Sequence, residues 1–169
     1  MTLLIDRLRS GGLIAAYQCQ SACPHCLYRG GPGRSPDYVS QEMAAACFAK
    51  ALSLGCAAMH VGGGEPLADP LGLAGVLAAA AETGMRLDYV ETSASWYDDA
   101  DEAVELLAEL RSMGLSTLLV SLSPMHNGFV PLEKTLGVME AARAAGVAVF
   151  PWQEHFLADL RAFDPASTH

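Results

Sequence analysis

Four glycines divide most of this chain into units of similar length. They are Gly55, Gly84, Gly114 and Gly146, and each follows a stretch of helical character and precedes a short apolar run. Glycine often ends helices because it adopts the left-handed backbone conformation without steric cost. The units recur about every 30 residues, which is the length of a βα unit. The sequence therefore predicts a repeated βα architecture.

The predicted helices begin at residues that favour helix N-termini. Ser40 is a suitable N-cap, Asp69 precedes a proline, the pair 98–99 is acidic, and Pro131 opens a further helix. A short last helix is expected over residues 154–163. The apolar runs that follow the glycines, together with an earlier one, predict strands at residues 13–16, 57–61, 87–90, 118–122 and 147–150.

The first predicted helix carries a possible core stripe. Met43, Cys47, Ala51 and Leu54 recur at helical spacing, so we expect this face to pack against the sheet. Cys47 and the more distant Cys56 are expected to be small buried groups rather than ligands.

The composition of the predicted strands indicates the sheet type. Their residues form continuous apolar runs rather than alternating patterns, which is typical of parallel strands buried on both faces. Right-handed crossovers would curl such a sheet into an open barrel or a doubly wound layer. We expect an α/β fold, a partial (β/α) TIM-like barrel of about five βα units in one domain spanning residues 1–169. A complete barrel has eight units.

Ligands bind at the carboxyl ends of the strands in parallel α/β sheets. In this chain those ends lead into polar or glycine-rich segments at residues 17–28, 62–66, 91–95 and 121–127. These segments are expected to meet at one mouth. His60 lies on an apolar strand instead, and we expect it to be a hydrogen-bonded core residue.

The charge of the chain limits its partners. The formal net charge is −9, which argues against a phosphate-backbone ligand, so no nucleic-acid partner is expected. Charged residues make up only 17% of the chain, and we expect some apolar face to meet a partner chain or a further segment. The longest uncharged apolar run, residues 71–81, is too short to span a bilayer, and residues 1–10 do not resemble an export signal. We therefore expect a cytoplasmic protein that has no membrane partner.

Three cysteines follow the first strand in close succession. Cys19, Cys23 and Cys26 form a C-x3-C-x2-C pattern, which points to metal ligation. A closed zinc site normally uses four ligands at recognisable spacings, and a disulfide framework suits short secreted chains with paired cysteines. Iron–sulfur clusters are ordinarily held by four cysteines. Three ligands would leave one iron open to another group.

The cysteine pattern and the glycine-rich segment at residues 62–66 together resemble motifs of the radical S-adenosylmethionine (SAM) enzyme family. Its C-x3-C-x-aromatic-C signature is matched by the three cysteines, with His25 in the aromatic position. Its Gly-Gly-Glu-Pro motif is matched by residues 63–66. The resemblance implies a [4Fe–4S] cluster and SAM as cofactors. It also implies reductive cleavage of SAM to a 5′-deoxyadenosyl radical, which abstracts hydrogen from a substrate.

The resemblance also assigns roles to individual residues. It implies that Gly63, Gly64 and Glu65 hold the methionyl amino group of SAM. It further implies polar SAM contacts, by position in the later motifs, for Thr92, Ser93, Ser121 and Ser123. His126, followed by Asn127, occupies the place of a His-Asp pair, where it would contact the substrate or SAM or fix the loop.

The resemblance leaves the reaction open. Members of the family commonly have six βα units and a carboxyl-terminal extension, so we expect the last unit and the extension to be missing from this sequence. The expected partners are an external electron donor such as flavodoxin or ferredoxin, a small-molecule or peptide substrate, and a chain that covers the open barrel. One alternative function is a cluster-binding accessory or electron-transfer protein without catalysis of its own. Another is a zinc-stabilised structural domain.

Overall fold

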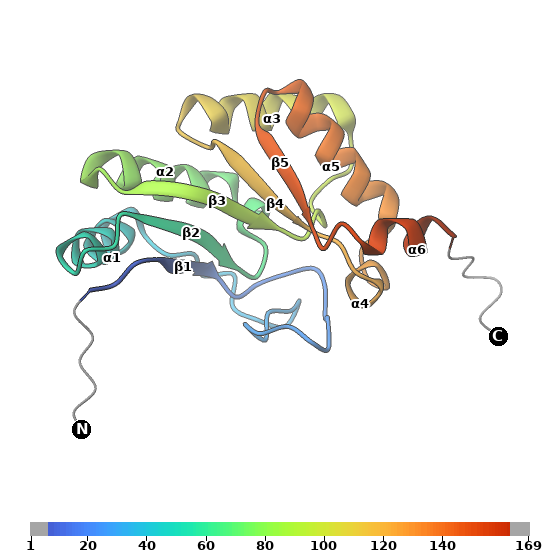
Figure 1. The fold of residues 1–169 in the computed structure, drawn as a ribbon, viewed down its shortest axis with the longest axis horizontal. Coiled ribbons are helices and arrows are strands. Elements are labelled where there is room, and N and C mark those ends of the chain that lie inside the picture. Colours follow the sequence, from blue (N-terminus) through green and yellow to red (C-terminus); the bar gives the residue numbers. More distant parts are fainter. Residues whose placement is uncertain (1–6, 163–169) are drawn as a thin grey trace.

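The computed structural model describes residues 7–162, which form one parallel five-stranded sheet (Figure 1). The strand order is β1-β2-β3-β4-β5, so each strand pairs with its neighbours along the chain. The strands are β1 (Gly11–Ala16), β2 (Ala58–Gly63), β3 (Arg86–Thr92), β4 (Thr117–Ser121) and β5 (Ala148–Trp152). The predicted α/β fold with about five βα units in a partial barrel is confirmed.

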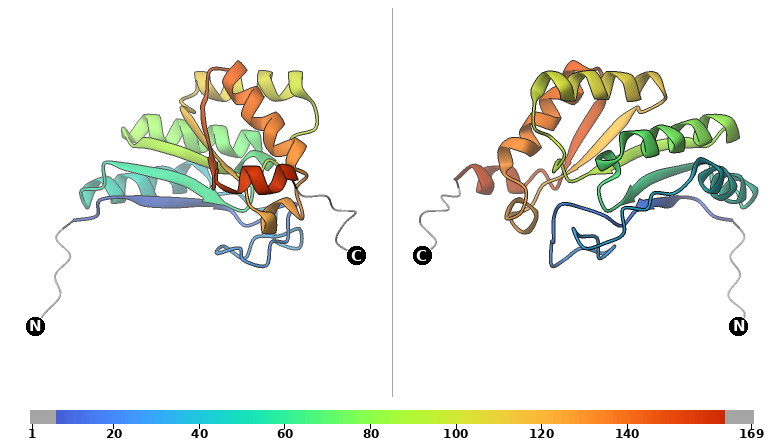
Figure 2. Two further views of the ribbon diagram at one scale, coloured as in Figure 1. Left: turned by 45° about the vertical axis from the view of Figure 1, so that its right-hand side comes forward. Right: turned by 180° about the vertical axis from the view of Figure 1, so that it is seen from behind.

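Helices connect the strands and cover one face of the sheet, as the rear view in Figure 2 shows. The crossover helices are α1 (Gln41–Ser53), α2 (Pro70–Thr83), α3 (Ala100–Ser112) and α5 (Leu132–Ala144). The shorter elements are the 3₁₀ helix η1 (Pro66–Ala68), α4 (Pro124–Asn127) and α6 (Phe156–Ala162). The core lies between the sheet and the crossover helices, with Phe48, Leu73, Leu107, Leu118 and Val138 fully buried there.

Local sequence determines where the crossover helices begin and end. Ser40 accepts a hydrogen bond from the Met43 amide, and Asp69 accepts one from Gly72, so each caps an N-terminus. Gly84 ends α2 in the left-handed conformation with φ 74°. Because these signals are local, the sequence predicted the helix ends to within a few residues.

Several expectations about local structure are wrong. α4 occupies a segment predicted to be a loop, because Ser123 caps it by accepting the His126 amide. In α1 the buried residues are Ala44, Phe48 and Ala51, whereas Met43 is 58% exposed, so the predicted stripe is displaced by one residue. The expected last helix begins two residues late, and its final predicted residue lies outside the described residues.

The apolar runs predicted strands buried on both faces, and this expectation is wrong for part of the sheet. β5 alternates between exposed and half-buried residues, and Trp152 is 58% exposed. The reason is that helices cover only one face of the five-stranded sheet. The opposite face is concave and carries the candidate site.

Candidate active site

The cysteine loop lies beyond the carboxyl end of β1, on the concave side of the sheet (Figure 1). Cys19 is buried, and its Sγ accepts the Ser21 amide at 3.4 Å. The amide of Cys26 donates to the carbonyl of Cys23 at 3.1 Å, which closes a turn between these two residues. All three cysteines line the same cavity.

Burial raises the pKa of both Cys19 and Cys23 above the ordinary thiol value. For Cys23, the neighbouring thiols of Cys19 and Cys26 raise it further. Thiolates brought together in this way repel one another unless a cation or metal group compensates their charge. A bound metal group would therefore stabilise the thiolate forms of these residues.

The glycine motif fixes this loop to the sheet. The Gly64 amide donates to the Ala16 carbonyl at 2.7 Å, and the Glu65 amide donates to the Gln18 carbonyl at 2.9 Å. A Cβ on Gly64 would overlap that Gln18 carbonyl, so the position excludes any side chain. Gln18, the residue immediately before Cys19, is thus held by the glycine motif. Close backbone packing explains why position 64 is a glycine.

Glu65 is buried at the base of the site and its carboxylate does not line the cavity. It accepts hydrogen bonds from the Leu67 amide at 3.0 Å, the Thr92 hydroxyl at 3.0 Å, and both the amide and hydroxyl of Ser93 at 2.7 and 2.5 Å. Burial raises its pKa and these donors lower it. In this geometry the carboxylate positions the loop after β3, while the expected contact with SAM stays a prediction.

His126 connects that loop with the cysteines. Its Nε2 lies 2.9 Å from the Ser93 carbonyl oxygen, and its Nδ1 lies 3.9 Å from Cys23 Sγ. Because a carbonyl only accepts, Nε2 carries the proton and Nδ1 faces the thiol as an acceptor. Burial lowers the pKa of His126 and so favours this neutral form. The geometry favours a role in fixing the loop, one of the alternatives predicted from the sequence.

These segments surround one cavity of about 540 Å³ beside the concave face. Every site residue predicted from the sequence lines it except Glu65. The predicted residues on its wall are Cys19, Cys23, His25, Cys26, Gly63, Gly64, Thr92, Ser93, Ser121, Ser123 and His126. The expected convergence of the strand-end segments on one mouth is confirmed.

The hydroxyl groups on this wall differ in their surroundings. Thr92 and Ser93 donate to Glu65, and Ser123 accepts from a backbone amide as the cap of α4. Ser21 is 4% exposed and lines the cavity, and among the described residues its hydroxyl has no hydrogen-bond partner. A buried hydroxyl without a partner is costly, so a ligand beside Cys19 would satisfy it.

Sequence reasoning missed an aromatic and acidic part of the cavity wall. Tyr28, Tyr89, Glu91 and Trp152 all line it. Glu91 and Tyr89 lie on β3, and the available signal was a carboxylate directly after Tyr89 and Val90, one residue before the end of the strand. His60 lies beside them, half-buried on the concave face rather than in the expected core position.

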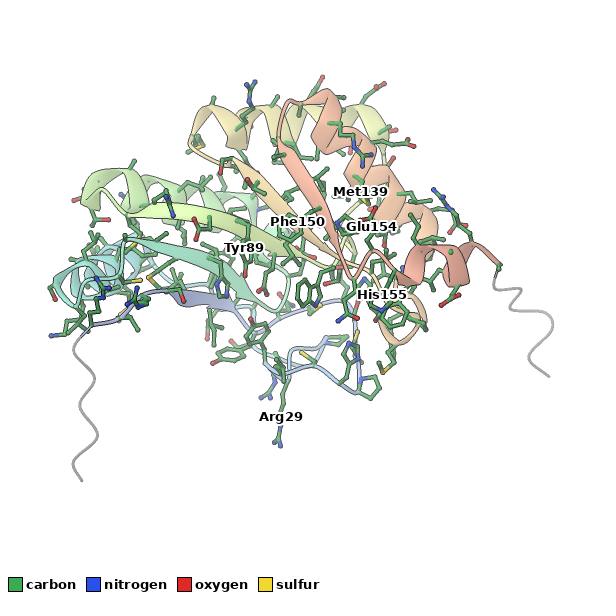
Figure 3. The ribbon with its side chains drawn as sticks, viewed as in Figure 1. Arg29, Tyr89, Met139, Phe150, Glu154 and His155 are labelled. Atoms are coloured by element: carbon green, nitrogen blue, oxygen red, sulfur yellow. The ribbon has the colours of Figure 1, made fainter. Side chains whose placement is uncertain are left out.

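Arg29 and the two remaining cysteines do not line the cavity. The Arg29 side chain projects away from the sheet in Figure 3, and its carbonyl accepts the Arg34 Nε at 2.7 Å. Cys47 is half-buried in α1, whereas Cys56 is buried in the core. Neither cysteine lines the cavity, but only Cys56 is buried as expected from the sequence.

Three thiols around one cavity are a donor set that fits a cluster held by three cysteines. Within residues 7–162 no group of three His, Cys, Asp or Glu side chains is placed to hold one metal ion. In a [4Fe–4S] cluster each cysteine binds a different iron, so its three thiolates need spacing around the group. The half-open cavity, the compensating charge that clustered thiolates need and the unpartnered Ser21 hydroxyl all suit such a group.

No helix among residues 7–162 is long and apolar enough to cross a membrane.

The parallel partial barrel carries three cysteines after β1 and the glycine motif at the end of β2, in the order that the radical SAM resemblance implies. The sequence model of the radical SAM superfamily matches residues 13–153, which is most of the chain. This chain belongs to the radical SAM superfamily. A comparison with curated proteins found no significant match.

Solved structures share the fold at low sequence identity. HydG, a maturase of the [FeFe]-hydrogenase, has a TM-score of 0.56 at 18% identity, over 86% of this chain and 36% of HydG. The AdoMet-bound anSMEcpe has a TM-score of 0.56 at 18% identity, over 85% and 42% of the two chains. Methylornithine synthase (PylB) has a TM-score of 0.58 at 16% identity, over 86% and 44%. The chain thus spans less than half the length of each of these structures.

Proposed function

We propose that this chain is the core of a radical SAM enzyme in which Cys19, Cys23 and Cys26 hold a [4Fe–4S] cluster and the adjoining cavity holds SAM. When bound and reduced, these cofactors supply a 5′-deoxyadenosyl radical for hydrogen abstraction from a small-molecule or peptide substrate. The electron comes from an external donor such as flavodoxin or ferredoxin. The observation that carries the proposal is the convergence of three thiols and the Gly63–Gly64 segment on one cavity.

The chain's own residues would divide the work. The cysteines bind the cluster, and the Ser21 hydroxyl lies where it can donate to a group beside Cys19. Gly63 and Gly64 present backbone carbonyls, which are suitable acceptors for the ammonium of SAM. Ser121 and Ser123 are further cavity residues that carry hydroxyls.

Glu65 and His126 have positioning roles in this scheme. Glu65 holds the loop of Thr92 and Ser93, and His126 connects Ser93 to Cys23. Both act through hydrogen bonds to cavity residues. The half-open cavity excludes bulk water only in part, so substrate or a covering segment completes the enclosure.

The test is SAM cleavage by protein that is reconstituted and assayed without oxygen. Dithionite and SAM should yield 5′-deoxyadenosine, detected by mass spectrometry. Cys23→Ala should lose both the iron and the product, because two thiolates do not retain the cluster. Cys47→Ala is the matched control and should keep both, since Cys47 lies outside the cavity.

The outcomes separate the alternatives from the proposal. A complete cluster with no 5′-deoxyadenosine from wild-type protein would contradict catalysis and favour an accessory or electron-transfer role. Zinc without iron or acid-labile sulfide in protein purified anaerobically would favour a structural domain.

A further inference from the structure

A second group of side chains lies on the concave face beside the cysteine loop. The Tyr28 hydroxyl donates to Glu91 Oε2 at 3.2 Å, and His60 Nε2 lies 3.6 Å from Glu91 Oε1. The rings of His60 and Tyr89 stack with centroids 5.0 Å apart. Tyr28, Tyr89 and Glu91 line the cavity, so this group is part of its wall and lies outside the motifs of the cysteine and glycine segments.

A β-bulge turns Glu91 toward the cavity. Met59 of β2 pairs with Leu87 of β3, whereas Val61 pairs with Val90, so one residue of β2 opposes two of β3. Side chains alternate along a strand, and the extra residue reverses which face the following positions occupy. Val90 is therefore buried in the core and Glu91 faces the concave side. Bulges of this kind occur often beside functional sites.

Two glycines leave room for the group. A Cβ on Gly62 would lie 2.5 Å from Glu91 Oε2, and a Cβ on Gly12 would overlap the His60 ring. Neither glycine is required by a left-handed backbone, because no positive φ is recorded at these positions. The absence of a side chain at both glycines therefore leaves the space that the side chains of His60 and Glu91 occupy.

Glu91 keeps capacity to accept further hydrogen bonds. An ionised carboxylate accepts about four hydrogen bonds, and the buried Glu65 receives that number from its neighbours. For Glu91, the Tyr28 hydroxyl is the close donor among the described residues. The His60 contact at 3.6 Å is longer than a hydrogen bond. The carboxylate thus faces the cavity with unused acceptor positions.

The surroundings of Glu91 suit a positive charge. Among the described residues that line the cavity none is Lys or Arg, and the basic side chain recorded beside the carboxylate is His60, 3.6 Å from Glu91 Oε1 and outside the cavity lining. Aromatic rings stand beside it, with Tyr89 in edge contact with Phe150 at 5.8 Å and Trp152 on the neighbouring wall. Figure 3 labels Tyr89 and Phe150 on the concave side. Aromatic rings attract cations, and the Glu91 carboxylate on the same cavity wall would add a direct ion pair with a bound cation.

We infer that Glu91, with the Tyr89 ring and the Tyr28 hydroxyl, binds a protonated amine of the substrate. The substrate class is then an amine-bearing small molecule or a peptide with a free amino group, and phosphorylated or other polyanionic compounds are excluded. The inference rests on the proposed function, because it places the substrate in the same cavity as SAM.

The test compares three probes of one shape and different charge. 2-Phenylethylamine, 2-phenylethanol and 3-phenylpropionate are titrated by ligand-observed NMR against cluster-loaded protein, with and without saturating SAM. A hydrogen bond to a charged group should make the amine bind about tenfold more tightly than the alcohol, and the carboxylate weakest. Glu91→Gln should remove that preference, whereas Glu105→Gln on the exposed surface of α3 should keep it.

The outcomes also separate this inference from the proposed function. Equal binding of amine and alcohol, or a preference that survives Glu91→Gln, would overturn the inference while leaving SAM cleavage in place. Displacement of the amine by SAM would overturn it too, because the site would then belong to the cofactor. If Glu91→Gln does not fold, Tyr89→Leu should narrow the amine-to-alcohol ratio about threefold, and an unchanged ratio would refute the inference. An amine preference in protein that cleaves no SAM would refute the proposed function alone.

Discussion

Removing the Glu65 carboxylate tests the physical role that the structure gives this residue. In Glu65→Ala the amides of Leu67 and Ser93 and the hydroxyl of Thr92 lose their acceptor in a buried place. Each unsatisfied buried donor costs about 1–3 kcal/mol, and loss of a carboxylate that is itself costly to bury offsets part of this. We expect a net loss of about 3 kcal/mol in the free energy of unfolding.

Urea unfolding of the reduced protein without its cofactors measures this loss. With a dependence of about 2 kcal/mol per M urea, the midpoint should fall by about 1.5 M. Glu65→Gln keeps one acceptor oxygen and should lose about half as much. Glu105→Ala, at an exposed position of α3, should change stability by less than about 0.5 kcal/mol. A Glu65→Ala midpoint within 0.3 M of wild type, about 0.6 kcal/mol on the same scale, would refute the argument and return Glu65 to a purely ligand-binding role.

Three further perturbations test other parts of the site. Gly64→Ala should destabilise the protein and reduce its iron content, because a Cβ would overlap the Gln18 carbonyl. Gly33→Ala is the control and should change neither quantity, since a Cβ there meets nothing within 4 Å. Ser21→Ala should keep the cluster and lower its midpoint potential in an EPR-monitored redox titration, since a hydrogen bond to the cluster favours the reduced form, and an unchanged potential would contradict that donor role. Burial together with Glu91 raises the pKa of Tyr28 to about 12, from an ordinary 10.0. The unfolded chain therefore loses this proton first, stability falls between pH 10 and 12, and Tyr28→Phe should reduce the loss of melting temperature on going from pH 9 to 11.

The fold was predictable because its signals are local. The caps at Ser40 and Asp69 and the terminating Gly84 each act within one helical turn, so the sequence located the βα units. The α1 stripe was displaced because apolar periodicity alone does not distinguish Met43 from the buried Ala44. Only packing against the sheet makes that choice.

The parts of the site at the carboxyl ends of strands could be predicted from the sequence. The parts that depend on tertiary contacts could not. Cys19 follows β1 and Gly63 is the last residue of the neighbouring β2, so their convergence could be predicted from parallel topology. The Glu65 carboxylate accepts hydrogen bonds from Thr92 and Ser93, which lie 27 and 28 positions later in the chain. No local sequence pattern predicts these contacts. The orientation of Glu91 depends on a bulge in pairing with β2, which a single strand sequence does not show.

The central claim is that three cysteines leave one iron of a [4Fe–4S] cluster for SAM. Mössbauer spectra of protein reconstituted with ⁵⁷Fe, recorded with and without SAM, test this most directly. We expect one iron in four to change its spectrum when SAM is added, and the change to be absent in Cys23→Ala, which lacks the cluster. Four irons that remain unaffected by saturating SAM would contradict the account.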